Sequence, residues 1–162
     1  MAERYGAVAG AEQPSRGQAV VHPSRSQWCD VAAAARADGF DQLIDLTAVD
    51  YLTYGADRGL PDQVAPERFE VVASLMSHER RERLRMRVQV PADDPTLPTL
   101  FDLWPGSENL EREVYDMFGI AFEGHPDLSR ILMPEDWTGH PLRKDYDAGQ
   151  IPVQFKVASN VR

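Results

Sequence analysis

The segment from Glu111 to Tyr146 constrains the fold of this chain most strongly. It begins with a helical pattern and then continues without any periodicity that would fold alone. Its Trp, Leu, Ile, Met and Tyr content is too high for a solvated linker, and its Gly and Pro residues interrupt it too often for a domain. Such a segment is stable when its apolar side chains are buried against another protein. The pattern therefore predicts a component of an assembly rather than a self-sufficient enzyme.

Length and net charge limit the number of domains and the kind of partner that we expect. A chain of 162 residues with 43% hydrophobic residues is enough for one domain with a real core. The net charge of −9 argues against nucleic acid or anionic lipid as the main partner, because both would repel the chain. No run approaches the ~20 apolar residues of a membrane span, and residues 1–25 lack the apolar stretch of a signal peptide. We therefore expect a cytoplasmic protein.

The cysteine count bears on redox chemistry. Cys29 is the one cysteine, whereas an iron–sulfur cluster needs about four thiolates. The chain also has neither a GxGxxG motif nor a Walker-type lysine loop that would bind a nucleotide. We therefore expect no cofactor in this chain.

The pattern outside the C-terminal segment predicts a small α+β fold. The expected elements are a helix from Ser26 to Gly39, strands over 43–51, 69–76 and 83–90, and helices over 96–104 and 107–118, the last capped by Ser107. They predict a two-layer domain over residues 25–122, with a small, mainly antiparallel or mixed sheet packed on helices. Residues 1–24 are expected to be a mobile leader, and residues 123–162 an extended partner-binding arm.

Acidic residues of the last helix are candidates for chemistry. Glu111, Glu113 and Asp116 are expected together at its surface. General acid–base catalysis needs two carboxylates that converge on one cleft in different environments. The spacing of four between Glu108, Arg112 and Asp116 instead indicates ion pairs along the helix. The spacing therefore disfavours a catalytic or metal site and leaves a solvated helix face or contact with a partner as the alternatives, of which the family resemblance given below favours the partner.

Two histidines lie in a short internal repeat, Gly124-His125-Pro126 and Gly139-His140-Pro141. A zinc site needs a third and a fourth ligand, and none is evident nearby. Gly and Pro on either side predict sharp bends, with each imidazole bonded to a backbone group. A stand-alone hydrolase that uses His125, Asp127 and His140 remains the alternative from another class.

The strongest basic run extends from His78 to Arg87 and contains five arginines. An exposed sheet face explains it, because the arginines alternate with apolar residues. Docking to an acidic partner is an open alternative. A nucleic-acid-binding module that uses Arg80 to Arg87 is a third, which the acidic total charge and the lack of aromatic residues in the run oppose.

One long stretch resembles a known family. Glu111-Arg112-Glu113, Tyr115 to Ile120, Gly124 to Leu128 and Gly139 to Tyr146 closely resemble the signature of the 30 kDa subunit of respiratory complex I, in its bacterial form. Asp45 to Tyr51 is a weaker match, so the resemblance covers about residues 40–146. Two positions depart from the family pattern: Ser129 replaces a basic residue, and Asp147 replaces a proline.

The resemblance implies a non-catalytic scaffold subunit in the peripheral arm of NADH:quinone oxidoreductase. Such a subunit would lie beside the quinone-site (49 kDa-like) and terminal-cluster subunits and hold them in register during electron transfer coupled to proton translocation. FMN and iron–sulfur clusters would belong to partner subunits, and the chain would lie peripherally on the cytoplasmic face of the cell membrane. The alternative is a homologous subunit of a membrane-bound hydrogenase or another reduced-cofactor dehydrogenase.

The candidate partner-binding residues follow from the resemblance together with residue chemistry. Trp and Arg are frequent interface anchors, and guanidinium groups pair with carboxylates in a bidentate manner. The candidates are Glu111, Arg112, Glu113, Tyr115, Asp116, Phe118, His125, Asp127, Arg130, Trp137, His140, Leu142, Arg143, Lys144, Asp145 and Tyr146.

Overall fold

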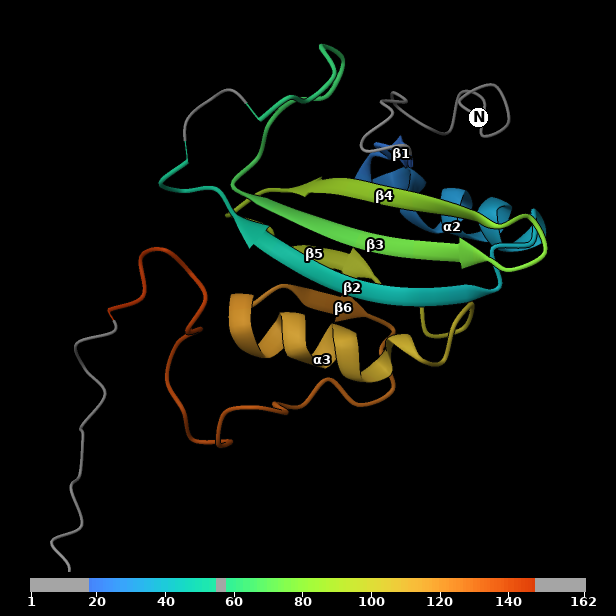
Figure 1. The fold of residues 1–162 in the computed structure, drawn as a ribbon. Coiled ribbons are helices and arrows are strands. Elements are labelled where there is room, and N and C mark those ends of the chain that lie inside the picture. The colour runs from blue at the N-terminus through green and yellow to red at the C-terminus, as the bar shows by residue number, and fades with distance from the viewer. Residues whose placement is uncertain (1–17, 55–57, 148–162) are drawn as a thin grey trace, which may run out of the picture.

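The computed structural model describes residues 18–54 and 58–147. These residues form an α+β fold in which a mixed four-stranded sheet packs against few helices, as the sequence predicts (Figure 1). The elements are β1 (Ala19–Val21), the 3-10 helix η2 (Arg25–Gln27), α2 (Trp28–Ala37), β2 (Gln42–Asp50), β3 (Phe69–Ser77), β4 (Glu82–Val90), β5 (Thr96–Pro98), α3 (Ser107–Phe118) and β6 (Ala121–Glu123).

The sheet has the strand order β1-β4-β3-β2. Strands β2, β3 and β4 are antiparallel neighbours, and β1 is parallel to β4. The predicted alternation of β4 is confirmed, because Leu84, Met86, Val88 and Val90 are at most 1% exposed, and the arginines between them point to the opposite face.

One face of the sheet carries the core. Trp28 and Val31 of α2 and Val114 of α3 share a buried cluster with the inward residues of β2, β3 and β4. Helix α3 ends at Gly119, which has a φ of 70° and donates its N–H to the carbonyl of Tyr115 at 2.8 Å. This left-handed residue turns the chain out of the helix and starts its return along the domain.

The start of the domain lies earlier than the sequence predicts. Strand β1 falls within the expected leader of residues 1–24, and its Ala19 and Val21 pair with Leu84 and Met86 of β4. The boundary predicted at residue 24 is therefore wrong for residues 18–24, since a three-residue strand gives no local signal of a distant parallel partner. Residues 1–17 lie outside the described part of the chain.

Two local predictions around α3 are also wrong. The apolar spacing over 96–104 predicts a helix, but residues 96–98 form β5, which is parallel to β6. Leu97, Leu100 and Trp104 are nevertheless buried, because the following turns place them against the core. Ser107 does not cap α3 either: the N-cap is Gly106, without a side-chain hydrogen bond to the helix end.

Candidate functional site

The chain after β6 returns along its own domain. In Figure 1 this segment passes beneath α3 and then runs towards the end of β2. The N–H of Leu142 donates to the carbonyl of Met117 at 3.0 Å, and that of Lys144 donates to Asp50 Oδ2 at 2.8 Å. We call residues 124–147 the return segment. The predicted arm is therefore packed on its parent domain up to residue 147, and residues 148–162 lie outside the described chain.

Asp116 is the first anchor of the return segment, and it is fully buried. Its Oδ2 accepts the N–H groups of Ile131, Leu132 and Met133 at 3.1, 2.8 and 2.8 Å, and Arg130 donates to its Oδ1. Burial alone would raise the pKa of Asp116, but these donors hold the pKa below its usual value. The prediction that Asp116 lies at the surface is wrong, because its carboxylate binds the chain's own backbone.

Arg112, one turn before Asp116 in α3, also binds the return segment. It donates to the carbonyl of Ser129 at 3.2 Å, to Ser129 Oγ at 3.0 Å and to the carbonyl of Arg130 at 3.1 Å. Among the described residues no ion pair joins Arg112 to Glu108 or Asp116, so the predicted ladder of helix ion pairs is wrong. Instead, both Arg112 and Asp116 form their hydrogen bonds with residues of the return segment.

Asp50, at the end of β2, is the second anchor and is 3% exposed. It accepts the N–H of Lys144 and two bonds from Arg68, at 3.1 and 2.8 Å. Arg68 also pairs with Asp145 at 2.7 Å. Burial would raise the pKa of Asp50, whereas the bonds from Arg68, Lys144 and Leu52 lower it below its usual value. The second half of the return segment is therefore fixed to the sheet.

The C-terminal end of α3 is covered by two side chains of the return segment. His140 Nδ1 donates to the carbonyl of Asp116 at 3.0 Å, and Arg143 Nε donates to the carbonyl of Phe118. These donors satisfy carbonyl groups that the helix end leaves unpaired. They pack so closely that a Cβ added to Gly119 would lie 2.5 Å from His140 Nε2 and 2.6 Å from Arg143 Nη2.

The N-terminal half of α3 holds the other histidine. His125 Nε2 donates to the carbonyl of Glu108 at 3.0 Å, and its Nδ1 accepts the N–H of Asp127 at 3.1 Å. Both histidines thus bond to backbone groups, as the sequence predicts.

Glu111 is fully buried and accepts the N–H of Leu100 at 2.7 Å, so its predicted place at the surface is wrong. Burial raises its pKa, against the bonds that it accepts.

The structure does not assemble the hydrolase constellation. His125 and His140 bond to carbonyl groups at positions 108 and 116, which lie two turns of α3 apart, a separation of about 12 Å along a helix. Within residues 18–54 and 58–147, no group of three or more His, Cys, Asp or Glu side chains is placed to hold a metal ion.

The remaining predicted residues lie at the surface or just below it. Glu113, Asp127, Leu142, Lys144 and Asp145 are exposed, and Phe118 is buried at 7% exposure. The half-buried ones are Arg112, Tyr115, His125, Arg130, Trp137, His140, Arg143 and Tyr146. The prediction misses Ile131 and Leu132, which are 38% and 60% exposed, although their position directly after Arg130 in an anchored segment is a usable signal.

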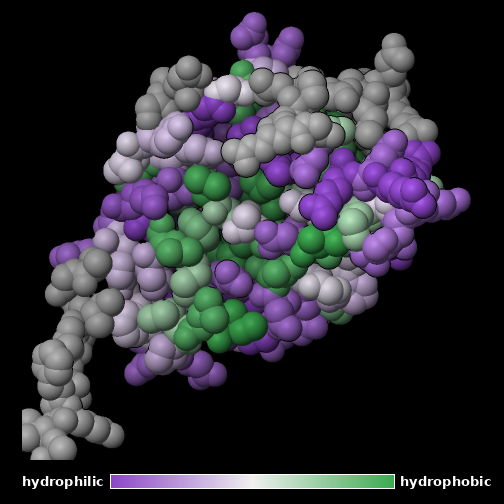
Figure 2. All heavy atoms as spheres, viewed as in Figure 1, coloured by the Kyte–Doolittle hydropathy of each residue, from purple (hydrophilic) through white to green (hydrophobic). Residues whose placement is uncertain are grey.

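Ile131, Leu132 and Leu142 form what we call the apolar edge of the return segment. Leu142 is 47% exposed, so all three present large apolar side chains to solvent while their backbone is anchored. Figure 2 shows hydrophobic side chains among polar ones over the strands and, below them, on the part of this face where α3 and the return segment lie. An ordered backbone with outward apolar side chains is the arrangement of a docking surface.

No helix within the described ranges has the length and apolarity needed to cross a membrane.

Comparison with known proteins identifies relatives of the whole fold. The family described as respiratory-chain NADH dehydrogenase, 30 Kd subunit, matches residues 21–151. Subunit 5 of the NADH-quinone oxidoreductase of Thermus thermophilus is 49% identical over 137 residues, which are 82% of this chain and 63% of that protein. An NADH-quinone oxidoreductase subunit of Acidothermus cellulolyticus is 42% identical over 147 residues, 89% of this chain and 71% of that protein. The chain thus spans less than two thirds of the Thermus relative.

Solved structures agree with these relatives. A trypsin-resistant fragment of Nqo5 is 44% identical and superposes with a TM-score of 0.64, over 73% of this chain and 89% of the fragment. A chain of an archaeal membrane-bound sulfane sulfur reductase shares the fold, with a TM-score of 0.72 at 22% identity over 97% of this chain and 92% of that one. By sequence and by fold, this chain belongs to the 30 kDa subunit family of the respiratory-chain NADH dehydrogenase.

Proposed function

We propose that the chain is a scaffold subunit in the peripheral arm of an NADH:quinone oxidoreductase. It would hold the cluster-bearing and quinone-site subunits in register while electrons pass to quinone, a reaction that the complex couples to proton translocation. Support comes from its family and from relatives that are named as subunits of this oxidoreductase.

The observation that carries this proposal is the anchored return segment with its apolar edge. Docking usually costs the ordering of loops and side chains, at about 0.5–1.5 kcal/mol for each immobilised flexible side chain. Here the backbone of residues 131–133 is already fixed by Asp116, and that of Lys144 by Asp50. Ile131, Leu132 and Leu142 can therefore be covered by a partner without first ordering the chain that carries them.

The anchors also explain how one small subunit could set a geometry. The return segment is tied to both ends of α3 and to the end of β2, so a partner bound to it is positioned relative to the sheet. Electron tunnelling and quinone access both depend on fixed distances between subunits. A rigid, non-catalytic chain would therefore influence the activity of the complex through assembly.

The proposal assigns the redox groups to other chains. FMN and the iron–sulfur clusters would be held by partner subunits. The partners next to this chain would chiefly be the quinone-site (49 kDa-like) and terminal-cluster subunits. The chain itself would carry no catalytic site and would reach the cytoplasmic face of the membrane only through the complex.

A double substitution at the apolar edge tests the proposal. Leu132→Asp with Leu142→Asp should leave the fold intact, because both side chains are exposed. It should lower the amount of assembled complex at least tenfold, since a charge in an apolar contact remains desolvated and unpaired. Leu52→Asp is the matched control, because Leu52 is 50% exposed on the loop after β2. Normal assembly and normal quinone reduction in the double variant would contradict the proposal.

A further inference from the structure

The sheet has a second face, which points away from the core. Helices α2 and α3 pack on the inward face, through Trp28, Val31 and Val114. The side chains that alternate with the inward ones are half-buried or exposed, and we call them the open face. They are Asp45, Thr47, Val49, Val72, Ser74, Met76, Arg83, Arg85 and Arg87. None of them belongs to the return segment.

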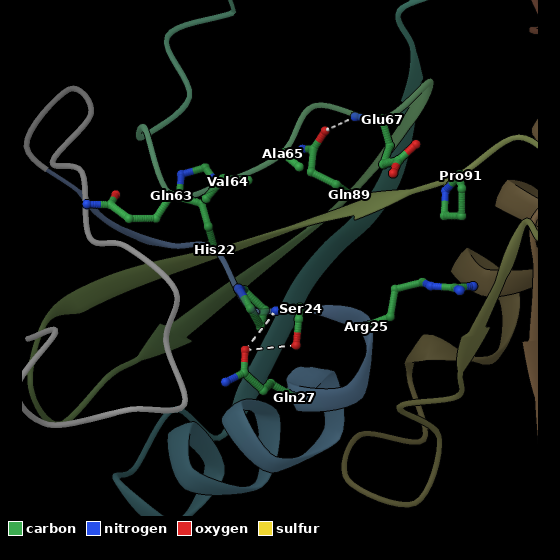
Figure 3. A pocket seen from close by; sticks show the side chains of 11 residues that line it. His22, Ser24, Arg25, Gln27, Gln63, Val64, Ala65, Glu67, Gln89 and Pro91 are labelled. Atoms are coloured by element: carbon green, nitrogen blue, oxygen red, sulfur yellow. Dashed lines mark hydrogen bonds between the residues drawn. The ribbon is translucent and has the colours of Figure 1, made fainter.

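The loop before β3 limits the open face at the end of β4. Gln89 Oε1 accepts the N–H of Glu67 at 3.2 Å and a guanidinium N–H of Arg58 at 3.4 Å. Gln89 and Glu67 also line a cavity of about 360 Å³ between this loop, the segment after β1 and the end of β4 (Figure 3). The surface that a partner can reach therefore begins beyond Gln89, at the cross-strand pair of Val72 and Arg87.

The arginines of β4 give the open face its charge. Arg87 is neutralised, because it donates to both carboxylate oxygens of the buried Glu70, at 2.9 and 3.0 Å. Arg85 donates to the uncharged amide of Gln18 at 3.1 Å. Among the described residues no carboxylate forms an ion pair with Arg83 or Arg85. Two neighbouring positive charges on this face are therefore uncompensated.

Asp45 is a carboxylate on the same face, but it lies too far away to pair with them. It stands in one cross-strand row with Ser74 and Arg85. Two strand spacings, about 10 Å, thus separate the backbones of Asp45 and Arg85. The net charge of −9 favours basic partners for the chain as a whole, whereas the row of Arg83 and Arg85 favours an acidic one locally.

Apolar side chains lie beside these arginines. Met76 is the cross-strand partner of Arg83, and Val72 is that of Arg87. Ile44, at the register shift of β2, is 46% exposed. A solvated face of an antiparallel sheet usually carries polar side chains, whereas β3 is apolar at Val72 and Met76 on its outward side too. Arginine next to apolar surface is typical of protein interfaces, from which other charged residues are depleted. Figure 2 shows this mixture of hydrophobic and polar side chains over the strands.

We propose that the open face binds an acidic segment of a partner protein. Its carboxylates would pair with Arg83 and Arg85, and its apolar side chains would cover Val72 and Met76. The two arginines are two positions apart on β4, about 6.8 Å along the strand, so carboxylates at alternate residues of an extended segment match them. A nucleic acid or an anionic membrane is disfavoured, because the acidic remainder of the chain would repel a large polyanion.

Titration of the full chain with a capped peptide of alternating Glu and Val residues tests the proposal. At about 0.15 M salt, where distant charges are screened, the amide resonances of Met76, Arg83 and Arg85 should shift and saturate. The same peptide with Gln in place of Glu should cause no saturable shift. Absence of a saturable response, an equal response to the Gln peptide, or shifts centred on another surface would overturn the proposal.

Variants separate the recognition of charge from the fold. Arg83→Gln with Arg85→Gln should weaken binding of the Glu peptide at least tenfold and leave the domain folded, because both side chains lie on the open face. Arg36→Gln, at an exposed position of α2, is the matched control and should bind as the parent chain does. Arg83→Glu with Arg85→Glu should lose the Glu peptide and bind its Lys counterpart. Equal affinity of the double Gln variant and the parent chain for the Glu peptide would contradict the assigned roles.

Vesicles that contain phosphatidylglycerol distinguish a membrane from an acidic peptide. The parent chain should not sediment with them at the same salt concentration. Sedimentation with the vesicles that the double Gln variant loses would assign the open face to a membrane and overturn the proposal. These assays use the full chain alone, so their result is independent of whether the apolar edge docks a partner.

Discussion

At the scale of single residues, Gly119 is where α3 and the return segment meet most closely. Gly119→Ala places a side chain at a φ of 70° and against His140 and Arg143. We expect a loss of about 2–4 kcal/mol in the free energy of unfolding, from left-handed strain of about 1–2 kcal/mol and overpacking of about 1–3 kcal/mol. Urea denaturation measures it.

Gly59 supplies the control for Gly119. Its φ is 60°, but a Cβ there would meet nothing within 4 Å. Gly59→Ala should therefore show the strain alone, about 1–2 kcal/mol. Equal losses at the two glycines would mean that His140 and Arg143 do not pack against the helix end as described.

His22 predicts a specific pH dependence. Its pKa falls from 6.5 to about 4 on folding, so the unfolded chain binds the proton more tightly. Its contribution to stability is fully present above about pH 6.5 and declines as the pH falls towards 4. Arg87 and Glu70 are the charged groups that act on the ring. His22→Leu should flatten the decline in unfolding free energy between pH 7 and 5, whereas parallel curves would contradict the neutral buried state.

At the scale of elements, the return segment should be part of the folding unit. Deletion of residues 148–162 keeps the bond of Asp50 to Lys144 and that of Asp116 to Met133, so the amides of Lys144 and Met133 should keep their protection from exchange. Deletion from residue 124 onwards leaves both buried carboxylates without their tail partners. Because breaking a buried pair costs about 3–5 kcal/mol, the shorter chain should be unfolded or insoluble. A stable, soluble domain of residues 1–123 would contradict this prediction.

Asp116 allows a finer test of the same element. Asp116→Asn keeps the shape but removes the charge that Arg130 and the backbone N–H groups of 131–133 bind. Bonds to a charged group are worth about 1.5–3 kcal/mol, so amide exchange at Leu132 and Met133 should accelerate at least tenfold. Glu113→Gln, on an exposed position of α3, is the control. Unchanged exchange rates would show that Asp116 does not hold the segment.

Acid should have the same effect as this substitution. The folded-state pKa values of Asp50 and Asp116 lie below the ordinary value of 3.8. Their stabilising contribution is therefore present above about pH 3.8 and is lost as the pH falls through the lower, folded-state values. The amides of residues 131–133 and 144 should lose protection in that range in the parent chain.

The sequence predicts the regular elements better than their surroundings. Alternation identifies β4 because its inward side chains are all apolar and its outward ones are polar. Strand β1 is not predicted from the sequence because its Ala19 pairs with Leu84, 65 positions away, and only this tertiary pairing orders the strand. The stretch 96–104 has helical spacing, yet Leu97 pairs with Phe122 across a parallel bridge.

The candidate site, too, is only partly predictable from the sequence. The resemblance identifies residues in contact with something, but it does not tell an internal contact from an external one. Asp116 illustrates this, because its spacing from Arg112 fits a surface ion pair while its actual partners lie 14 to 17 positions downstream. The burial of Asp116 becomes evident only when the return segment is seen to lie on α3.

At the scale of the whole molecule, the proposed scaffold is a rigid subunit whose exposed apolar edge needs a partner. The chain has a net charge of −9, which keeps it soluble before assembly and favours partners with basic surfaces. Neither feature requires a redox group in this chain.

Recovery of the tagged full chain from gently solubilised native membranes, with mass spectrometry of the proteins bound to it, tests the central claim most directly. We predict co-purification of iron–sulfur, NADH-binding flavin and membrane subunits, and their loss with the Leu132→Asp, Leu142→Asp variant. Recovery of the parent chain alone would contradict the scaffold role, and recovery of a nickel enzyme in place of the flavin subunit would assign the chain to a hydrogenase.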